Sequence, residues 1–190
     1  FAYEAEVGTL SERDADRIER VLLEKVRSET EAMSVRASAL ASAGYFSTEE
    51  VRAEVRRALS RDGLRLAAIR AIGRNRDPIW TPVLEEQMSS DDPVVRRVAA
   101  EAAADYEGTV DALADLVDDP DTSVRMAAIS SLGKIGGDEA LDTLIYCYES
   151  SDPAIRDAAA AALQEMEEEN EDLLGLDGGI GRWDSEDEAR

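Results

Sequence analysis

The 190-residue sequence contains no histidine and a single cysteine, Cys147. Histidine is the commonest general base and, with cysteine, a principal zinc ligand, so this scarcity excludes zinc sites and cysteine–histidine catalysis. One cysteine cannot close an internal disulfide, and Cys147 lies in the apolar stretch 144–148, which favours a buried and unreactive thiol. We therefore expect a protein that is not an enzyme, with no catalytic residue, no metal and no cofactor.

Aromatic residues make up only 5% of the chain, and no window reaches the roughly 18 uncharged apolar residues that a membrane span needs. The 43 acidic residues outnumber the 21 basic ones, and the net charge of -22 opposes binding to phosphate backbones and anionic membranes. We expect a cytoplasmic protein that binds neither nucleic acid nor membrane. The acidity also suits a salt-rich cytoplasm, where screening weakens the repulsion between carboxylates, although ordinary acidic proteins share this composition.

What the chain does contain is a recurring arginine. At five places an arginine follows a valine, leucine or isoleucine and precedes a run of small residues, mostly alanine. These marker arginines are Arg36, Arg65, Arg96, Arg125 and Arg156. They lie 29, 31, 29 and 31 residues apart, and such a period is typical of arrays of helical repeats.

Each repeat has the pattern of two helices joined by a tight turn. In the fifth, Asp138 is expected to cap a first helix whose apolar residues recur at three- and four-residue intervals. Asp152 and Pro153 have the identities of an N-cap and a first helical residue, so they begin a second helix that runs to about Met166. We assign units to residues 10–44, 45–76, 77–107, 108–136 and 137–168, followed by an acidic tail at 169–190.

Three of these second helices begin with similar motifs, at residues 92–100, 121–133 and 152–163. They resemble the short, phycobilin-lyase-type variety of the HEAT repeat, whose motif is Asp-Pro-x-Val-Arg-x-x-Ala-Ala-x-Ala-Leu-Gly. The resemblance covers about residues 30–166, strongly in units three to five and loosely in the first two, which lack the aspartate–proline turn. It implies an all-α fold: a right-handed α-α superhelix, or solenoid, of about five HEAT-like helix hairpins over residues 1–168.

In HEAT-like folds the recurrent arginine is similar to a structural residue that pairs with the turn aspartate of its own or a neighbouring unit. Charge-assisted bonds of this kind suit a packed turn, although a ligand-binding use of the arginines is an alternative. The expected ladder comprises Asp62, Arg65, Asp92, Arg96, Asp121, Arg125, Asp152 and Arg156.

Residues 51–76 reverse the local charge, because eight arginines face two acidic residues there and give +6. This basic segment could bind an acidic peptide, a phosphate group or the protein's own tail, or it could balance adjacent acidic units. In HEAT-like superhelices the second helix of each pair lines the concave side. Residues one and five positions after a marker arginine are expected to face outward on this side. From them we select Leu66, Arg70, Arg97 and Met126 as candidate contacts, and we add Arg74 of the basic segment.

Repeat scaffolds serve many functions, so the resemblance leaves several open. The leading hypothesis is a non-enzymatic scaffold that binds a peptide or protein on its concave or edge surface. A HEAT-like DNA alkylation-repair glycosylase is one alternative, but the second helices carry neither a uniform basic track nor an aromatic ladder, and Trp80 is expected to pack at an inter-unit edge. A phycobilin-lyase-type accessory protein is another, although nothing in the sequence marks a bilin site.

The end of the chain has its own composition, with 11 acidic and two basic residues between positions 165 and 190. Such a composition is typical of disorder, yet it contains apolar residues with the character of a short linear motif. These are Leu173, Leu174, Leu176, Ile180 and Trp183. We expect this segment to pack on a helix pair or on a neighbouring molecule, and its acidity suits the arginine-rich second unit.

Overall fold

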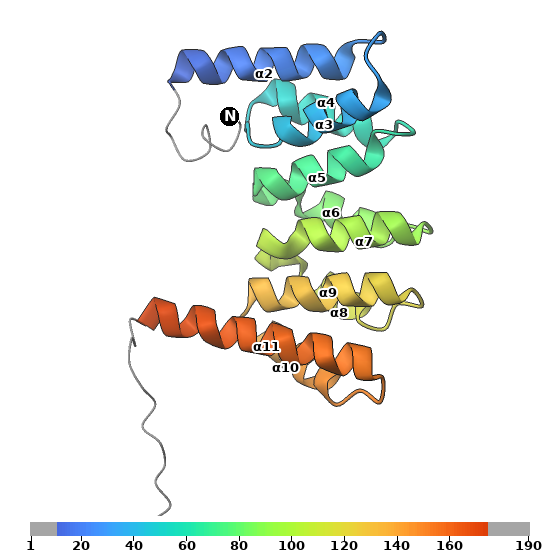
Figure 1. The fold of residues 1–190 in the computed structure, drawn as a ribbon, viewed down its shortest axis with the longest axis vertical. Helices are drawn as coiled ribbons and strands as arrows, with labels where there is room; N and C mark the ends of the chain where they lie inside the picture. Colours follow the sequence, from blue (N-terminus) through green and yellow to red (C-terminus); the bar gives the residue numbers. More distant parts are fainter. Residues whose placement is uncertain (1–10, 175–190) are drawn as a thin grey trace, which may run out of the picture.

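The computed structural model describes the backbone of residues 11–174 and the side chains of residues 11–168. These residues form helix hairpins that stack one on the next into a solenoid, with α2 at one end and α11 at the other (Figure 1). The hairpins are α2 (Glu12–Arg27) with α3 (Met33–Ala43), α4 (Glu49–Leu59) with α5 (Arg65–Asn75), α6 (Thr81–Met88) with α7 (Pro93–Ala102), α8 (Val110–Leu116) with α9 (Thr122–Ile135), and α10 (Asp138–Tyr148) with α11 (Pro153–Leu174). Short 3-10 turns at Pro78–Trp80, Ala103–Asp105 and Glu107–Thr109 lead into α6 and α8. The expected all-α repeat fold is confirmed.

Aspartates begin the second helices of the last three units, as the sequence predicts. Asp92, Asp121 and Asp152 each accept a hydrogen bond from the amide two residues ahead, at 2.9, 2.8 and 2.9 Å. Such a bond satisfies an amide that has no partner inside the helix. Pro93 and Pro153 occupy the first helical position, where a missing N–H costs nothing.

Two local expectations differ from the structure. Asp138 does not cap α10 but is its first residue, because Gly136 and Gly137 make the turn with φ of 69° and 84°, in the left-handed region that favours glycine. The second helix of the last unit does not end near Met166 but continues to Leu174, so the first residues of the expected tail are helical. The expected motif residues Leu176, Ile180 and Trp183 lie outside the described residues, as do the side chains of Leu173 and Leu174.

The second helices, α3, α5, α7, α9 and α11, form a continuous row in which each packs against the second helix of the next unit. Small residues allow this close approach. A Cβ added to Gly133 would lie 2.8 Å from the Cβ of Ala162, and one added to Gly44 would lie 2.2 Å from the backbone oxygen of Ala71. Gly73 lies at the corresponding place in α5. Glycine and alanine at these positions therefore allow the second helices of successive hairpins to stack closely.

Hydrogen bonds from buried aromatic residues connect successive units. Trp80 is 2% exposed, and its indole nitrogen donates to the side-chain oxygen of Asn75 at 2.9 Å. The Asn75 amide in turn donates to the backbone oxygen of Gly44 at 3.0 Å. The hydroxyl of Tyr106 donates to the backbone oxygen of Ile72 at 2.6 Å, and burial raises the pKa of this phenol. Trp80 thus lies at the inter-unit edge where the sequence predicts it.

Candidate interaction surface

Three of the five marker arginines donate into the turn between the two helices of their own unit. In Arg96, Arg125 and Arg156, a guanidinium nitrogen donates to the backbone carbonyl six residues earlier, at 2.8, 2.8 and 3.0 Å. The turn aspartates of the same units cap the second helices, and none of them pairs with the marker arginine of its own unit. Within one unit, arginine and aspartate therefore stabilise the same turn through different partners.

Between units, Arg96 makes the best-defined ion pair of the turns. Its guanidinium donates two hydrogen bonds to the carboxylate of Asp119 in the next unit, at 2.7 and 2.9 Å. The two side chains are 14% and 5% exposed. The hydrogen bond from Arg96 holds the pKa of Asp119 below its ordinary value, while the same bond raises the pKa of Arg96. Asp119 is buried whereas its neighbour Asp118 is exposed, and no periodicity in the sequence distinguishes these two carboxylates.

The other steps of the expected ladder are less regular. A guanidinium nitrogen of Arg125 lies 3.7 Å from the carboxylate of Asp152 in the next unit. Arg65 donates to the buried side chain of Gln87 at 2.8 Å, and Asp62 is exposed and takes no part in this contact. The predicted pairing of Arg65 with Asp62 is therefore replaced by a hydrogen bond to an uncharged side chain of the next unit. The α5 helix also starts without an aspartate cap.

Much of the positive charge in the basic segment 51–76 is compensated inside the protein. Glu54 is 1% exposed, and its carboxylate accepts hydrogen bonds from Arg57 at 2.9 Å and from Arg27 of α2 at 3.1 Å. Arg52 pairs with Asp77 at 2.5 Å. Glu54 shares the buried face of α4 with Val51, Val55 and Ala58, although it is a charged residue in an acidic chain. Intramolecular balancing therefore accounts for most of the local charge reversal.

One part of the basic segment is not compensated in this way. Leu66, Arg70 and Arg74 follow one another at intervals of four residues and so share one face of α5. Leu66 is half-buried against the core, Arg70 is exposed, and the Arg74 guanidinium lies 5.6 Å from the centroid of the Tyr45 ring. Within the described side chains, 11–168, neither Arg70 nor Arg74 makes an ion pair.

The remaining candidates lie on the next two second helices. Arg97 on α7 is half-buried and pairs with Glu101 one turn further along. Met126 on α9 is 37% exposed and lines a groove of about 400 Å³ with Ser130 and Lys134. Because α5, α7 and α9 lie side by side, the candidates share one side of the solenoid (Figure 1). We call Leu66, Arg70, Arg74, Arg97 and Met126 the second-helix face.

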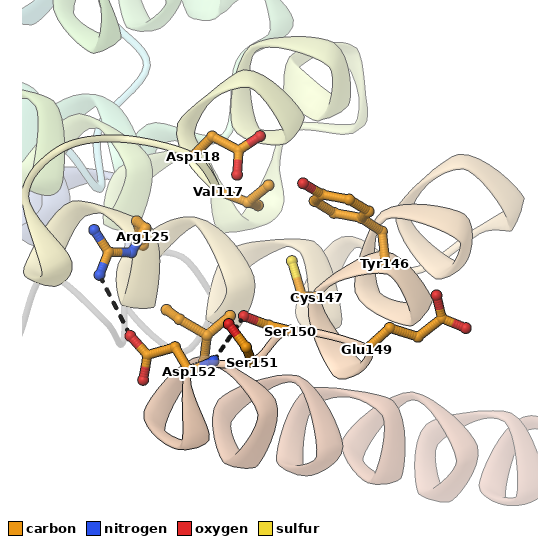
Figure 2. Close-up of a pocket in the computed structure, with 10 residues that line it drawn as sticks. Val117, Asp118, Arg125, Tyr146, Cys147, Glu149, Ser150, Ser151 and Asp152 are labelled. Atoms are coloured by element: carbon orange, nitrogen blue, oxygen red, sulfur yellow. Dashed lines mark hydrogen bonds and ion pairs between the residues drawn. The ribbon is translucent and has the colours of Figure 1, made fainter.

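A larger groove, of about 560 Å³, lies between the last two units. Figure 2 shows Val117 and Tyr146 on one side of it, with the Arg125–Asp152 pair at the far end. Cys147 also lines this groove; it is 2% exposed, and burial raises the pKa of its thiol to about 11. A thiol in this state stays protonated near neutral pH, so the groove contains no activated nucleophile at this residue.

Two further properties concern the described part of the chain. Between residues 11 and 168, no three or more cysteine or carboxylate side chains lie close enough to hold a metal ion. Over the same part, no helix combines the length and the apolar character that crossing a membrane requires.

Stacked hairpins with capped second helices and arginine-filled turns define an α-solenoid of short helical repeats. A family model for HEAT repeats matches residues 19–104, 60–118 and 81–164, and the chain therefore belongs to the HEAT repeat family. The fold is similar to the crystal structure of an engineered protein from the Northeast Structural Genomics Consortium, with a TM-score of 0.52, 20% identity and coverage of 79% of each chain. That identity supports a shared fold only. No curated protein matches the sequence.

Proposed function

We propose that this protein is a non-enzymatic, cytoplasmic scaffold that binds an acidic peptide segment of another protein along the second-helix face. The observation that supports this most strongly is the Arg70 and Arg74 pair, whose charges have no carboxylate partner among the described side chains of a protein with a net charge of -22. HEAT repeats commonly act as scaffolds for protein interactions. The scarcity of catalytic residue types in the sequence agrees with this role.

The dimensions of the second-helix face suit an extended segment. Packed helices lie about 9 Å apart, so the two steps from α5 to α9 span roughly 18 Å. An extended chain advances about 3.3 Å per residue, so about six residues would cover that distance. Acidic side chains would pair with Arg70 and Arg74, and an apolar side chain would enter the groove beside Met126. The acidic end of this chain, or that of a neighbouring copy, is a segment of the same kind.

The alternatives derived from the family resemblance receive less support. A glycosylase needs accessible aromatic residues and a basic groove around a base, whereas Trp80 is 2% exposed and hydrogen-bonded to Asn75. Arg96 and Arg125 are committed to turns and are not available to a phosphate backbone. No residue of the described grooves suggests attachment of a pigment.

Affinity capture from the native lysate tests the proposal. The wild-type protein is compared with the Arg70→Glu/Arg74→Glu variant, which reverses both uncompensated charges. A matched control is Arg13→Glu/Arg17→Glu, because these two exposed arginines are likewise one turn apart but lie on α2 at the end of the array. We expect the captured protein to be lost with the α5 variant and retained with the α2 variant, as measured by quantitative mass spectrometry.

Equal recovery of the same proteins with all three forms would contradict the proposal. Recovery of nucleic acid that is released steeply as salt rises would favour the glycosylase alternative instead. Circular dichroism of each variant establishes that helix content is unchanged, so that loss of binding is not loss of folding.

A further inference from the structure

An apolar stripe lies exposed on α10, the first helix of the last unit. Leu141, Ile145 and Tyr148 are 37%, 45% and 51% exposed. Their spacing of four and three residues places them on one face of the helix. Three large apolar side chains at this exposure form a contiguous surface of the kind that marks an interaction site rather than scattered surface residues.

The equivalent positions of the preceding unit indicate which surface of the solenoid this stripe belongs to. In the preceding unit the corresponding positions, 31 residues earlier, are Val110, Ala114 and Val117; Val110 and Val117 are 9% and 5% exposed, and Ala114 is half-buried. Val117 faces the next hairpin, since it lines the groove shared with Tyr146 of α10 (Figure 2). The stripe therefore occupies the surface that a first helix uses to pack against a following helix, at the edge of the described solenoid.

The adjacent second helix does not offer a similar surface. Gly133 of α9 allows α11 to approach closely, but the corresponding residue of α11 is Gln164, which is exposed. Its side chain occupies the place where another closely stacked second helix would lie. A single helix beside α10 suits this edge better than a complete additional hairpin.

The charge around the stripe determines the chemistry of its occupant. Asp138, Asp142 and Glu149 are exposed on α10 or directly after it, and Asp111 and Asp115 are exposed on α8. Neither α8 nor α10 contains a lysine or arginine. An apolar stripe flanked only by carboxylates is complementary to a helix with leucine-like residues on one side and lysine or arginine on the other.

We propose that the edge of α10 is a second docking site, which binds a basic amphipathic helix of a partner protein. It is separate from the second-helix face and does not depend on the proposed acidic ligand of that face. Two other occupants are disfavoured by charge. A second copy brings a net charge of -22, and residues 175–190 of this chain contain five acidic and two basic residues.

A synthetic peptide provides a direct test. The probe is a fluorescein-labelled helix of leucine and lysine, about 14 residues long, with its leucines on one face; a scrambled peptide of the same composition has the same charge without that face. Binding to the full chain is measured by fluorescence anisotropy. We expect the amphipathic peptide to bind at least about tenfold more tightly than the scrambled one, because only it can bury the stripe.

Variants of the stripe separate this site from general attraction to an acidic protein. Ile145→Ser and Tyr148→Ser are each expected to weaken binding of the amphipathic peptide by about tenfold, since each removes an apolar side chain from the contact. Val21→Ser is the matched control, because Val21 is exposed on α2 to the same 45% as Ile145. It should leave the affinity unchanged, and so should the Arg70→Glu/Arg74→Glu variant of the other face.

Three results would overturn the proposal. The first is equal binding of the amphipathic and scrambled peptides, or affinities that the two stripe variants leave unchanged. The second is a dimer in sedimentation equilibrium that the stripe variants dissociate, because the occupant would then be a second copy. The third is a more than about tenfold rise in the affinity for the amphipathic peptide when residues 175–190 are removed, because that segment would then be the occupant of the stripe.

Discussion

Replacing Gly133 by alanine is expected to push apart two stacked second helices. The new Cβ would lie 2.8 Å from the Cβ of Ala162, closer than such atoms approach in proteins, and 3.1 Å from its Cα, which is also a tight contact. Overpacking of this kind costs about 1–3 kcal/mol, whereas alanine in place of glycine inside a helix contributes about 1 kcal/mol. We therefore expect a net loss of about 1 kcal/mol in the free energy of unfolding, although alanine is the better helix former.

A double-mutant cycle separates the clash from helix propensity. Ala162→Gly removes the atom nearest to the new Cβ, so the double variant should be more stable than the sum of the single effects by about 1–2 kcal/mol. Ala160→Gly on the exposed side of α11 is the control for the loss of an alanine from the same helix. Stability is measured by urea unfolding followed by circular dichroism. Additive effects, or stabilisation by Gly133→Ala alone, would refute the close-packing argument.

Three further predictions concern the turn residue Asp119 and the buried thiol of Cys147. Asp119→Ala should lower the urea midpoint more than Asp118→Ala, because only Asp119 accepts both hydrogen bonds from Arg96. Since the pKa of Asp119 is lowered in the folded protein, its stabilisation is present above the ordinary aspartate pKa of about 3.9 and is lost as pH falls through the lowered value. Asp119→Asn should therefore flatten the loss of stability on acidification, and an unchanged pH profile would contradict this. Cys147 should react with a thiol reagent at pH 8 at least about 100-fold more slowly in the native chain than in the unfolded chain. The reason is that its pKa of about 11 leaves little thiolate in the native protein. Equal rates in the two states would show that the thiol is not buried.

The periodicity of the sequence was sufficient to predict the hairpins, because one turn chemistry recurs. Asp92, Asp121 and Asp152 begin second helices in the structure, and each is followed four residues later by an arginine that fills the turn. Where the repeat is irregular, the prediction was less accurate. Asp62 is exposed instead of pairing with Arg65, which donates to Gln87, and two glycines replace the expected cap at Asp138.

Residues that act across units were harder to find from the sequence. Asp119 and Glu54 resemble the many solvated carboxylates of this acidic chain, and only the packing of neighbouring units shows that both are buried. The same applies to the stripe on α10, whose apolar residues have the spacing of a core face. Sequence spacing locates a helix face but does not identify what covers it, so exposure of Ile145 could be recognised only in the assembled array.

Placing a photo-reactive residue on each side of the solenoid tests the central claim most directly. A benzophenone amino acid replaces Met126 on the second-helix face in one variant and Val21 on α2 in another, and both are irradiated in the native lysate. We predict that a partner protein is cross-linked from position 126, and that Arg70→Glu/Arg74→Glu abolishes the adduct while position 21 gives none. Equal cross-linking from position 21, or an adduct at position 126 that survives the charge reversal, would contradict binding through this face.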